Sequence, residues 1–330
     1  MRVVITGGTG FLGSVLARRL LERGSLTSPA GSRQPVEEIV LVDAAAPAAP
    51  TAWPASVTTV IGDVADRGLL SSVVDRDDVS VFHLASVVSA GAEADFDGAL
   101  RVNLDGCLAV LEACRARESA PRVVFTSSIA AFGGAAVRSV VSDSSKLTPE
   151  TTYGTTKAIC ELLVNDYTRK GFIDGRSARL PTVVVRPGRP NAAASSWVSG
   201  ILREPLNGEA STLPVEAATG VPISGYRTIV ENLVRLHELD GAALGSDRAL
   251  NLPALNVTAG GMLESLRCAA NRPLGPVAVA PDPAVVSFFS RWAQWSDFER
   301  ALGLGLAVDA DLETVIGEYL EDFLGGRRGE

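Results

Sequence analysis

The sequence is poor in the residues that build metal sites and disulfide frameworks. Its 330 residues include two histidines and four scattered cysteines, with no C-x-x-C pair and no histidine beside a cysteine. These spacings match no familiar zinc site, so we expect no bound metal. We also expect a reducing, cytoplasmic environment for the thiols. The residues predicted to be buried free thiols are Cys107, Cys114, Cys160 and Cys268.

Long apolar runs and excess positive charge are also lacking. No run approaches the ~20 apolar residues that a membrane helix needs. The chain opens directly with a predicted strand and shows no basic region before an apolar core, so we expect no secretory signal. A net charge of −8 and a pI near 5.0 argue against a nucleic-acid or anionic-membrane partner. Aromatics make up 5% of the residues, but 46% are hydrophobic, which suits a large core of small aliphatic side chains.

Short apolar strands separated by helical stretches dominate the first part of the chain. Predicted strands cover residues 1–6, 37–43, 57–66, 79–86, 121–128 and 178–188, and a long helix covers 101–117. The strands are continuously apolar rather than alternating, which is typical of a parallel sheet covered on both faces. The sequence therefore predicts an α/β fold with a Rossmann-type, doubly wound parallel sheet.

Two features interrupt this regularity. Residues 26–35 are rich in turn formers and predict a surface loop before the second strand. After Gly188 the strand–helix alternation is lost. We expect residues 1–188 to form a dinucleotide-binding domain, to which parts of the later chain return. Residues 189–330 are expected to form mainly a smaller, C-terminal substrate-binding domain.

The stretch TGGTGFLG joins the first strand to the first helix. Gly7, Gly10 and Gly13 are spaced as G-x-x-G-x-x-G. One glycine allows the tight turn, one lets a pyrophosphate approach the backbone, and one lets the helix pack on the sheet. The phosphates would then lie at the N terminus of the helix. The alternative is a tight turn with no ligand, but the strand–turn–helix context favours dinucleotide binding.

Acidic residues follow two of the predicted strands. Asp43 ends the second strand, where a carboxylate can accept both ribose hydroxyls of the adenosine half of the cofactor. The 26–35 insertion accounts for its unusually long separation from Gly13. Because no arginine follows Asp43 in the next loop to hold a 2′-phosphate, the sequence favours NAD over NADP. Asp63 either caps the adenine or is an ordinary turn aspartate.

Tyr153 and Lys157 lie one helical turn apart in the stretch TTYGTTKAICE. A surface tyrosine packed on a lysine stem would give the same spacing. Next to a nicotinamide cofactor, however, a base is needed to remove the hydroxyl proton when the carbon that bears the hydroxyl gives up a hydride. The ordinary tyrosine pKa of ~10 is too high for this task, and a nearby lysine and a positive nicotinamide would lower it. Ser127 and Ser128, at the end of the fifth strand, offer hydroxyls to hold the substrate.

These motifs together resemble the extended short-chain dehydrogenase/reductases over nearly the whole chain. The matching pieces are TGGTGFLG, GDVAD, FHLAS, RVNLDG, TSSIAAFG, YGTTK, RLPTVVVRPG and WSDFERALG. The resemblance implies that Tyr153 is the general base, that Lys157 lowers its pKa and holds the nicotinamide ribose, and that Ser128 orients the substrate. It implies that Asn103 supports the lysine side of the site. The cofactor contacts it implies are Gly7, Gly10, Phe11, Leu12, Gly13, Asp43, Asp63, Val64, Leu84, Ala85, Tyr153, Lys157, Pro181 and Val183.

Departures from the family pattern reduce the number of activities to be considered. Sugar-nucleotide dehydratases carry an acidic pair after the strand-end threonine, where this chain has Ser127-Ser128-Ile129 after Thr126. Sugar-nucleotide epimerases typically read R-Y-F-N where this chain reads RLPT from Arg179. The stretches RPGRPNAAASSW, ILREPLNGEA and VVSAGAEADFDGALRVNLDG instead resemble the subgroup that oxidises the C2 hydroxyl of D-erythronate, a four-carbon sugar acid, with NAD.

The substrate residues expected for such an acid are Arg186, Asn191 and Ser195, besides Ser128 and Tyr153. Arg186 can bind a carboxylate through two parallel hydrogen bonds. Asn191, Ser195 and Ser196 offer amide and hydroxyl partners for a polyol, although each can equally be an ordinary loop residue. His83 is expected to pack at a strand end without a catalytic role.

Two other functions stay open at this point. One is an NAD-dependent sugar-nucleotide epimerase that regenerates its cofactor in every cycle. The other is a non-catalytic NAD sensor on the same fold. Relatives commonly form homodimers through the two helices around residues 104–116 and 158–167, although burial inside one chain explains the same apolar pattern. The particular sugar acid, its stereochemistry and the strictness of NAD over NADP stay open.

Overall fold

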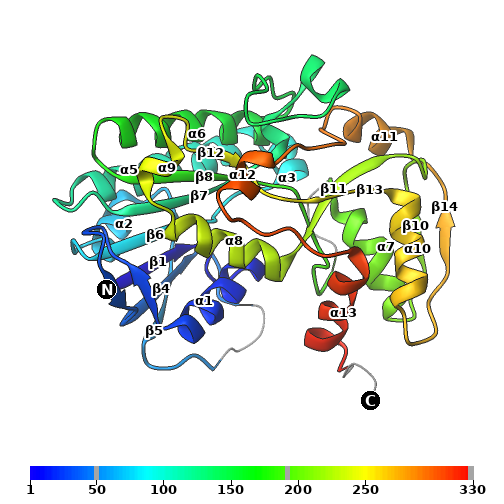
Figure 1. The fold of residues 1–330 in the computed structure, drawn as a ribbon, viewed down its shortest axis with the longest axis horizontal. Helices are drawn as coiled ribbons and strands as arrows, with labels where there is room; N and C mark the ends of the chain where they lie inside the picture. The colour runs from blue at the N-terminus through cyan, green and yellow to red at the C-terminus, as the bar shows by residue number, and fades with distance from the viewer. Residues whose placement is uncertain (48–51, 190–193, 326–330) are drawn as a thin grey trace. The chain divides into compact units, whose positions relative to one another are not determined.

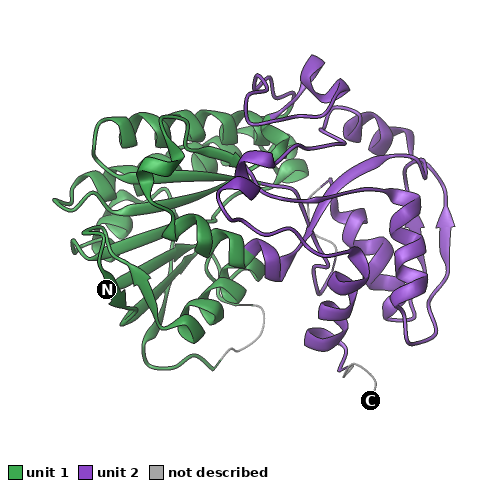
Figure 2. Ribbon diagram, viewed as in Figure 1, with its two compact units in different colours: residues 1–131, 151–179, 230–250 green, residues 132–150, 180–229, 251–330 purple. Residues whose placement is uncertain are grey.

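In a computed structural model, the described residues are 1–47, 52–189 and 194–325. The chain divides into two compact units, shown in Figure 2. The first unit consists of residues 1–131, 151–179 and 230–250, and the second of residues 132–150, 180–229 and 251–330. Each unit thus gathers stretches that are distant in the sequence.

A seven-stranded sheet forms the centre of the first unit (Figure 1). Its order is β12-β8-β7-β6-β1-β4-β5, and the pairs from β7 to β5 run parallel. The bounds are β1 Arg2–Thr6, β4 Glu38–Asp43, β5 Val57–Ile61, β6 Val79–His83, β7 Arg122–Ser128, β8 Asp174–Leu180 and β12 Ala249–Asn251. The predicted α/β fold with a doubly wound parallel sheet is confirmed.

The strand order reverses beside β1. On one side of β1 the chain continues outward through β4 and β5, and on the other side through β6, β7 and β8. The turns after β1 and β6 therefore leave the sheet next to each other, and ligands of such sheets bind at the carboxyl ends of the strands at this point. In the parallel register, Thr6 at the end of β1 lies opposite both Val42 of β4 and His83 of β6.

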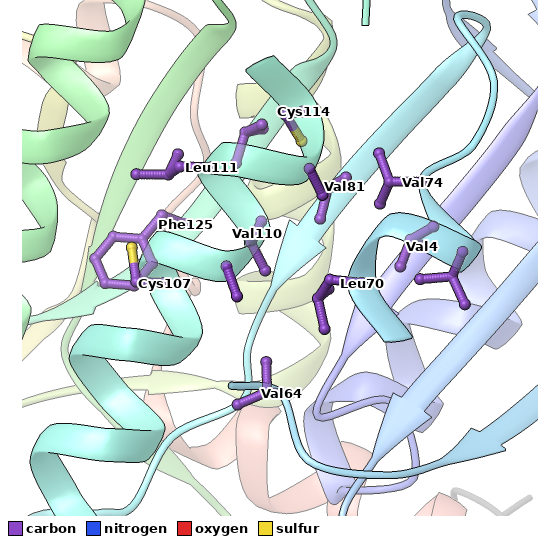
Figure 3. Close-up of a cluster of buried hydrophobic side chains, with 14 of the residues drawn as sticks. Val4, Val64, Leu70, Val74, Val81, Cys107, Val110, Leu111, Cys114 and Phe125 are labelled. Carbon is purple, nitrogen blue, oxygen red and sulfur yellow. The ribbon is translucent and has the colours of Figure 1, made fainter. Parts of the chain in front are cut away.

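Helices cover both faces of this sheet. On one face lie α2 (Arg67–Val73), α5 (Gly106–Arg115) and α6 (Thr152–Arg169). Their apolar side chains pack with strand residues such as Val4, Val81 and Phe125 into the core cluster shown in Figure 3. On the other face, α1 (Phe11–Arg23) is joined by ion pairs of 2.9 Å to the 230–238 part of α8 (Tyr226–Glu238). The remaining helical segments of this unit are α3 Ser89–Ala94, α4 Phe96–Ala99, η1 Leu100–Asp105, η2 Ile129–Ala131 and α9 Gly241–Leu244.

Local sequence signals fix the ends of these helices. Gly24 ends α1 in the left-handed conformation, with φ of 69°. Asp66 caps α2, and the Thr151 hydroxyl caps α6 by accepting a hydrogen bond from Gly154 N at 3.0 Å. The cap places the first turn of α6, which carries Tyr153, directly after Thr151.

Three expectations need correction. Residues 26–35 are not an irregular loop, because β2 (Ser25–Thr27) and β3 (Arg33–Pro35) pair there as a small antiparallel hairpin. The long helix expected over 101–117 begins as the π-helical turn η1 and continues as α5. Cys107, Cys114 and Cys160 are buried free thiols as predicted, but Cys268 is exposed.

The second unit is a smaller α/β assembly. A three-stranded sheet has the order β13-β11-β9, with β11 antiparallel to β13 and parallel to β9. A parallel pair, β10 and β14, lies beside α7, which also contacts α10. The bounds are η3 Gly134–Arg138, β9 Thr182–Val184, α7 Ser196–Leu206, β10 Ser211–Leu213, β11 Gly220–Gly225, β13 Leu255–Thr258, α10 Ala259–Ala269, β14 Val277–Val279, α11 Pro283–Phe289, α12 Glu299–Gly303 and α13 Leu312–Phe323. Across the described parts of the chain, no helix has the length and hydropathy to cross a membrane.

Candidate active site

The turn between β1 and α1 forms a close-packed backbone cradle. Gly7 has φ of +70°, and a Cβ there would lie 2.8 Å from Ala85 N. A Cβ at Gly13 would lie 2.2 Å from Gly7 O, which would push the helix off the turn. A Cβ at Gly10 would meet just Gly7 O, at 3.2 Å, with open space beyond. Since no described side chain caps the N terminus of α1 through a hydrogen bond, this turn leaves room and positive dipole for a pyrophosphate.

Two carboxylates flank this cradle. Asp43 ends β4, and its Oδ2 accepts a hydrogen bond from Thr9 N at 3.1 Å, which ties the glycine turn to the neighbouring strand. Asp63 follows β5, where its Oδ1 accepts a hydrogen bond from Ala65 N at 2.8 Å and its Oδ2 pairs with Arg101 at 2.6 Å. Contact of Asp63 with an adenine would therefore have to share the carboxylate with this arginine.

The apolar cofactor residues expected near the cradle have two different environments. Leu84 and Ala85 follow β6, and their N–H groups donate to Thr6, at 3.0 Å and 3.3 Å. This contact brings the β6 turn against Gly7. The side chain of Val64, in contrast, is buried in the core cluster and labelled in Figure 3, so its backbone is the part that can face a ligand.

His83 is part of the packing beneath this turn. Its side chain is buried, its Nδ1 shares a hydrogen bond of 2.6 Å with the Thr6 hydroxyl, and its ring stacks on Phe125. Burial, and to a smaller extent Lys157, lowers the pKa of His83 to about 3. A neutral imidazole in this position holds the ends of β1 and β6 together.

Ser128, Tyr153 and Lys157 meet at the end of β7. Tyr153 and Lys157 lie on one face of α6, and the Lys157 Nζ is 5.5 Å from the centre of the Tyr153 ring. The Nζ donates a hydrogen bond to Thr126 O at 2.8 Å, which ties α6 to the strand end. Ser128, two residues further along β7, is close enough to lower the pKa of the Tyr153 phenol. The structure thus brings together three of the four residues that the sequence placed in the catalytic set, the fourth being Asn103.

Burial has the largest effect on the pKa values of Tyr153 and Lys157. It raises the pKa of Tyr153 to about 12, against a smaller lowering by the Ser128 hydrogen bond. It lowers the pKa of Lys157 to about 8, partly offset by the neighbouring thiols and by Glu161. The sequence predicted a lowered tyrosine pKa with nicotinamide present; in the protein alone the shift is upward.

Asn103, the fourth residue of the predicted catalytic set, lies on the π-helical turn η1. Such π turns are frequent at functional sites. Its buried amide accepts a hydrogen bond from Val87 N at 2.8 Å and donates to Val87 O at 3.0 Å. It also donates to the Thr156 hydroxyl at 3.1 Å, and Thr156 in turn donates to Tyr153 O at 2.9 Å. Asn103 therefore fixes the first turn of α6 and the loop after β6.

Sequence reasoning missed a buried ion pair one turn beyond Lys157. Glu161 on α6 receives hydrogen bonds from Arg179 Nε and Nη2, the latter at 2.8 Å, and both side chains are buried. The Ser127 hydroxyl also donates to Glu161. The available signal was the spacing of Glu161 four residues after Lys157, within the stretch that already held the catalytic pair.

The other described residues that are predicted to bind substrate or nicotinamide lie in the second unit. Pro181 separates β8 from β9, and Val183 lies on β9. Arg186 donates from its backbone N to the Ser199 hydroxyl at 3.2 Å, and its carbonyl accepts from Arg203 Nη1 at 2.9 Å. Burial and the neighbouring Arg203 lower the pKa of the Arg186 guanidinium. Ser195 precedes α7 at its N-cap position, and Asn191 lies outside the described residues.

The first unit can therefore hold a dinucleotide beside a phenol, a hydroxyl and an ammonium group that are arranged for proton transfer. Within the described ranges, no three or more histidine, cysteine, aspartate or glutamate side chains gather to hold a metal ion. Proton transfer coupled to the chemistry of an organic cofactor is what this arrangement of groups can perform.

Comparisons with known proteins agree with this geometry. The model of the NAD dependent epimerase/dehydratase family matches residues 3–219. D-erythronate dehydrogenase from Cupriavidus necator is 48% identical over 98% of both chains. D-erythronate dehydrogenase from Haemophilus influenzae is 38% identical over 97% of this chain and 99% of its own. The crystal structure of a nucleoside-diphosphate-sugar epimerase from Agrobacterium tumefaciens superposes with a TM-score of 0.89 at 39% identity, covering 99% of this chain and 95% of the other.

Proposed function

Because this chain belongs to the NAD dependent epimerase/dehydratase family and is an NAD-dependent dehydrogenase, we propose that it oxidises the C2 hydroxyl of a small sugar acid, with D-erythronate as the first candidate. The observation that carries this proposal is the Ser128–Tyr153–Lys157 set at the end of β7, in a chain 48% identical to a D-erythronate dehydrogenase. The product would be the corresponding 2-oxo acid, 2-oxo-tetronate.

The glycine cradle and Asp43 are the residues that fit the cofactor. The open space beyond Gly10 and the uncapped end of α1 suit a pyrophosphate, and Asp43 at the end of β4 suits the adenosine ribose. Bound NAD would supply the acceptor for the C2 hydride and a positive charge near the phenol. Phe11, Leu12, Leu84, Ala85, Pro181 and Val183 are the further residues that we propose as cofactor contacts.

Tyr153 is proposed as the general base. Ser128, which acts on the pKa of the phenol, is proposed to hold the oxygen of the substrate against it. The hydroxyl proton of the substrate passes to the phenolate oxygen of Tyr153 as the C2 hydride leaves, so that the substrate loses one proton and one hydride and a carbonyl forms. Lys157 favours the phenolate through its charge and is held in place by Thr126 O.

The second unit is proposed to bind the acid. Arg186 is the candidate for the carboxylate, because a guanidinium can form two parallel hydrogen bonds with it. Arg203 holds the Arg186 backbone carbonyl at 2.9 Å and adds a second positive charge to this segment. Ser195 and Asn191 are the candidates for the remaining hydroxyl groups of the substrate.

The experiment is an NADH appearance assay with the purified protein, NAD and a panel of C4 to C6 aldonic acids that includes D-erythronate and L-threonate. A clear preference for one four-carbon acid, with a 2-oxo acid as product, is expected. Tyr153→Phe should lower kcat by about 10²–10⁴-fold while NADH still binds. Turnover close to that of the parent in Tyr153→Phe would refute the assignment of the base.

A second candidate activity is favoured by one comparison. The solved structure with a TM-score of 0.89 is that of a nucleoside-diphosphate-sugar epimerase. An epimerase would convert a UDP-sugar without net release of NADH. UDP-sugars therefore belong in the same assay. If the protein converts a UDP-sugar and forms no NADH with any of the acids, the epimerase activity replaces the sugar-acid proposal.

Of the two helices expected to form a homodimer interface, around residues 104–116 and 158–167, we propose that the second, α6, does so together with α4. Leu162 and Ile159 on α6 are 66% and 37% exposed, and Phe96 on α4 is 57% exposed. Large apolar side chains gathered on neighbouring helices favour a second copy of the chain as their partner. Light scattering after size exclusion should report a dimer, and Leu162→Glu should shift it to the monomer. A parent protein that elutes as a monomer would contradict this proposal.

A further inference from the structure

One carboxylate on α6 connects three elements at the edge of the sheet that carries the candidate site. Glu161 accepts hydrogen bonds from Arg179 near the end of β8 and from Ser127 at the end of β7. Glu161 is 1% exposed and Arg179 is 3% exposed. Two buried charges with several hydrogen bonds between them fix a particular relative placement of their backbones, because any displacement leaves a charge without its partner.

This connection lies immediately beside the proposed catalytic groups. Lys157 precedes Glu161 by one turn of α6, and its Nζ bonds Thr126 O, the residue before Ser127. Ser128, which lies close enough to lower the pKa of the Tyr153 phenol, follows Ser127. Two hydrogen bonds thus connect α6 to the end of β7, one from Lys157 to Thr126 O and one from Ser127 to Glu161. The hydrogen bonds from Arg179 to Glu161 connect α6 to β8 as well.

We propose that the Glu161–Arg179 ion pair is a positioning device, which holds the helix bearing Tyr153 and Lys157 in register with the strand end bearing Ser128. Neither residue touches the substrate in this proposal. It rests on the proposed function only in assigning roles to Ser128, Tyr153 and Lys157. Displacement of these groups by about 1 Å is enough to lower turnover about 100-fold.

A charge-free replacement separates positioning from simple stability. Buried ion pairs replaced by apolar side chains of similar volume often keep or gain stability. Glu161→Leu/Arg179→Met should therefore recover most of the melting temperature that Glu161→Gln alone loses. It should not restore the ties to Ser127 and to β8, so kcat should stay about 100-fold below that of the parent, with an unchanged Kd for NADH.

The matched control is the ion pair at the other end of the same strand. Arg176 and Asp174 pair at 2.5 Å near the start of β8, and the Arg176 side chain is fully buried. Asp174→Asn should lower the melting temperature but leave kcat within about threefold of the parent, because this end of β8 carries none of the proposed catalytic groups.

A substrate-free measurement supplies a second readout. The chain has three lysines, and Lys146 and Lys170 are exposed, so lysine labelled with ¹³C at Cε gives a resolved titration of Lys157. The titratable groups around its Nζ are Tyr153, Cys160 and Glu161 on α6, Cys107 on α5 and His83 on β6. Burial holds the pKa of Lys157 near 8, and Glu161 favours its charged form. Glu161→Gln should move the midpoint to lower pH, whereas Asp174→Asn should leave it in place.

The outcomes are decisive in each arm. A Glu161→Leu/Arg179→Met variant that is as stable as the parent and keeps more than about a tenth of its kcat would overturn the proposal. If that variant does not fold, Arg179→Lys decides by the same threshold, because it keeps the charge and removes the two-pronged contact. An unmoved Lys157 midpoint in Glu161→Gln would also overturn it. If the parent oxidises no sugar acid, the proposed function fails, but these tests still run on whichever substrate it converts and on the titration.

Discussion

Acid should destabilise this protein through its two histidines. His83 and His237 are both buried, and burial lowers their pKa to about 3 and about 4, from an ordinary value of 6.5. Glu238 and the Ser80 hydroxyl contact the ring of His237, which also stacks on Phe82. In the unfolded chain both rings take up a proton below pH 6.5, whereas in the folded chain they stay neutral.

The size of this effect follows from proton linkage. A histidine with a lowered folded pKa contributes stability above pH 6.5 that is lost as the pH falls toward the folded pKa. At pH 5 the unfolded histidine is almost fully protonated and the folded one is not, which favours unfolding by about 2 kcal/mol per ring. The two rings together remove about 4 kcal/mol, a large share of the ~5–15 kcal/mol typical of folded proteins.

Urea unfolding followed by circular dichroism at pH 7.5 and pH 5.0 measures this loss. His83→Gln and His237→Gln should each reduce the difference between the two pH values by about 2 kcal/mol, whatever their stability at pH 7.5. Glu238, whose pKa is lowered to about 2, stays charged over this range and adds little. If the double variant loses as much stability between the two pH values as the parent does, the histidines are not the cause.

Three further changes test the site and its surroundings. Gly13→Ala places a methyl group 2.2 Å from Gly7 O, so isothermal titration should show NADH binding at least about tenfold weaker, and unchanged affinity would contradict the cradle. Asn103→Ala removes the amide contacts to Val87 and Thr156. If Asn103 orients the first turn of α6, the variant should lower kcat by a larger factor than it raises the Kd for NADH. A thiol reagent should modify Cys268 in the native protein and the three buried thiols only after unfolding; fast native reaction of a second thiol would contradict their burial.

Much of the fold and part of the site were accessible from the sequence. The alternation of apolar strands and helices predicted the doubly wound sheet, because each strand buried on both faces must be continuously apolar. The glycine spacing and the Tyr153–Lys157 spacing are local patterns. They depend on a few neighbouring residues and on one turn of helix, so reading them requires no knowledge of distant contacts.

The hairpin at residues 25–35 and the π-helical turn at 100–105 were not accessible in this way. The hairpin has strands of three residues each, too short for a periodic signal. The π turn has the same composition as the helix that it precedes, and its buried Asn103 is held by the loop after β6 and by α6. The π turn therefore goes with contacts from other elements, and the local amino-acid preferences of residues 100–105 do not indicate it.

The sequence by itself determined a dinucleotide cradle, a tyrosine–lysine pair on one helix face and the family to which they belong, since all three rest on spacing along the chain. Only the tertiary structure showed that Ser127, next to the Ser128 that the family resemblance had selected, bonds Glu161, 34 residues away. It also decided that Arg179 completes that buried ion pair. These partners come from separate strands and a helix, and their meeting depends on the register in which β7, β8 and α6 pack.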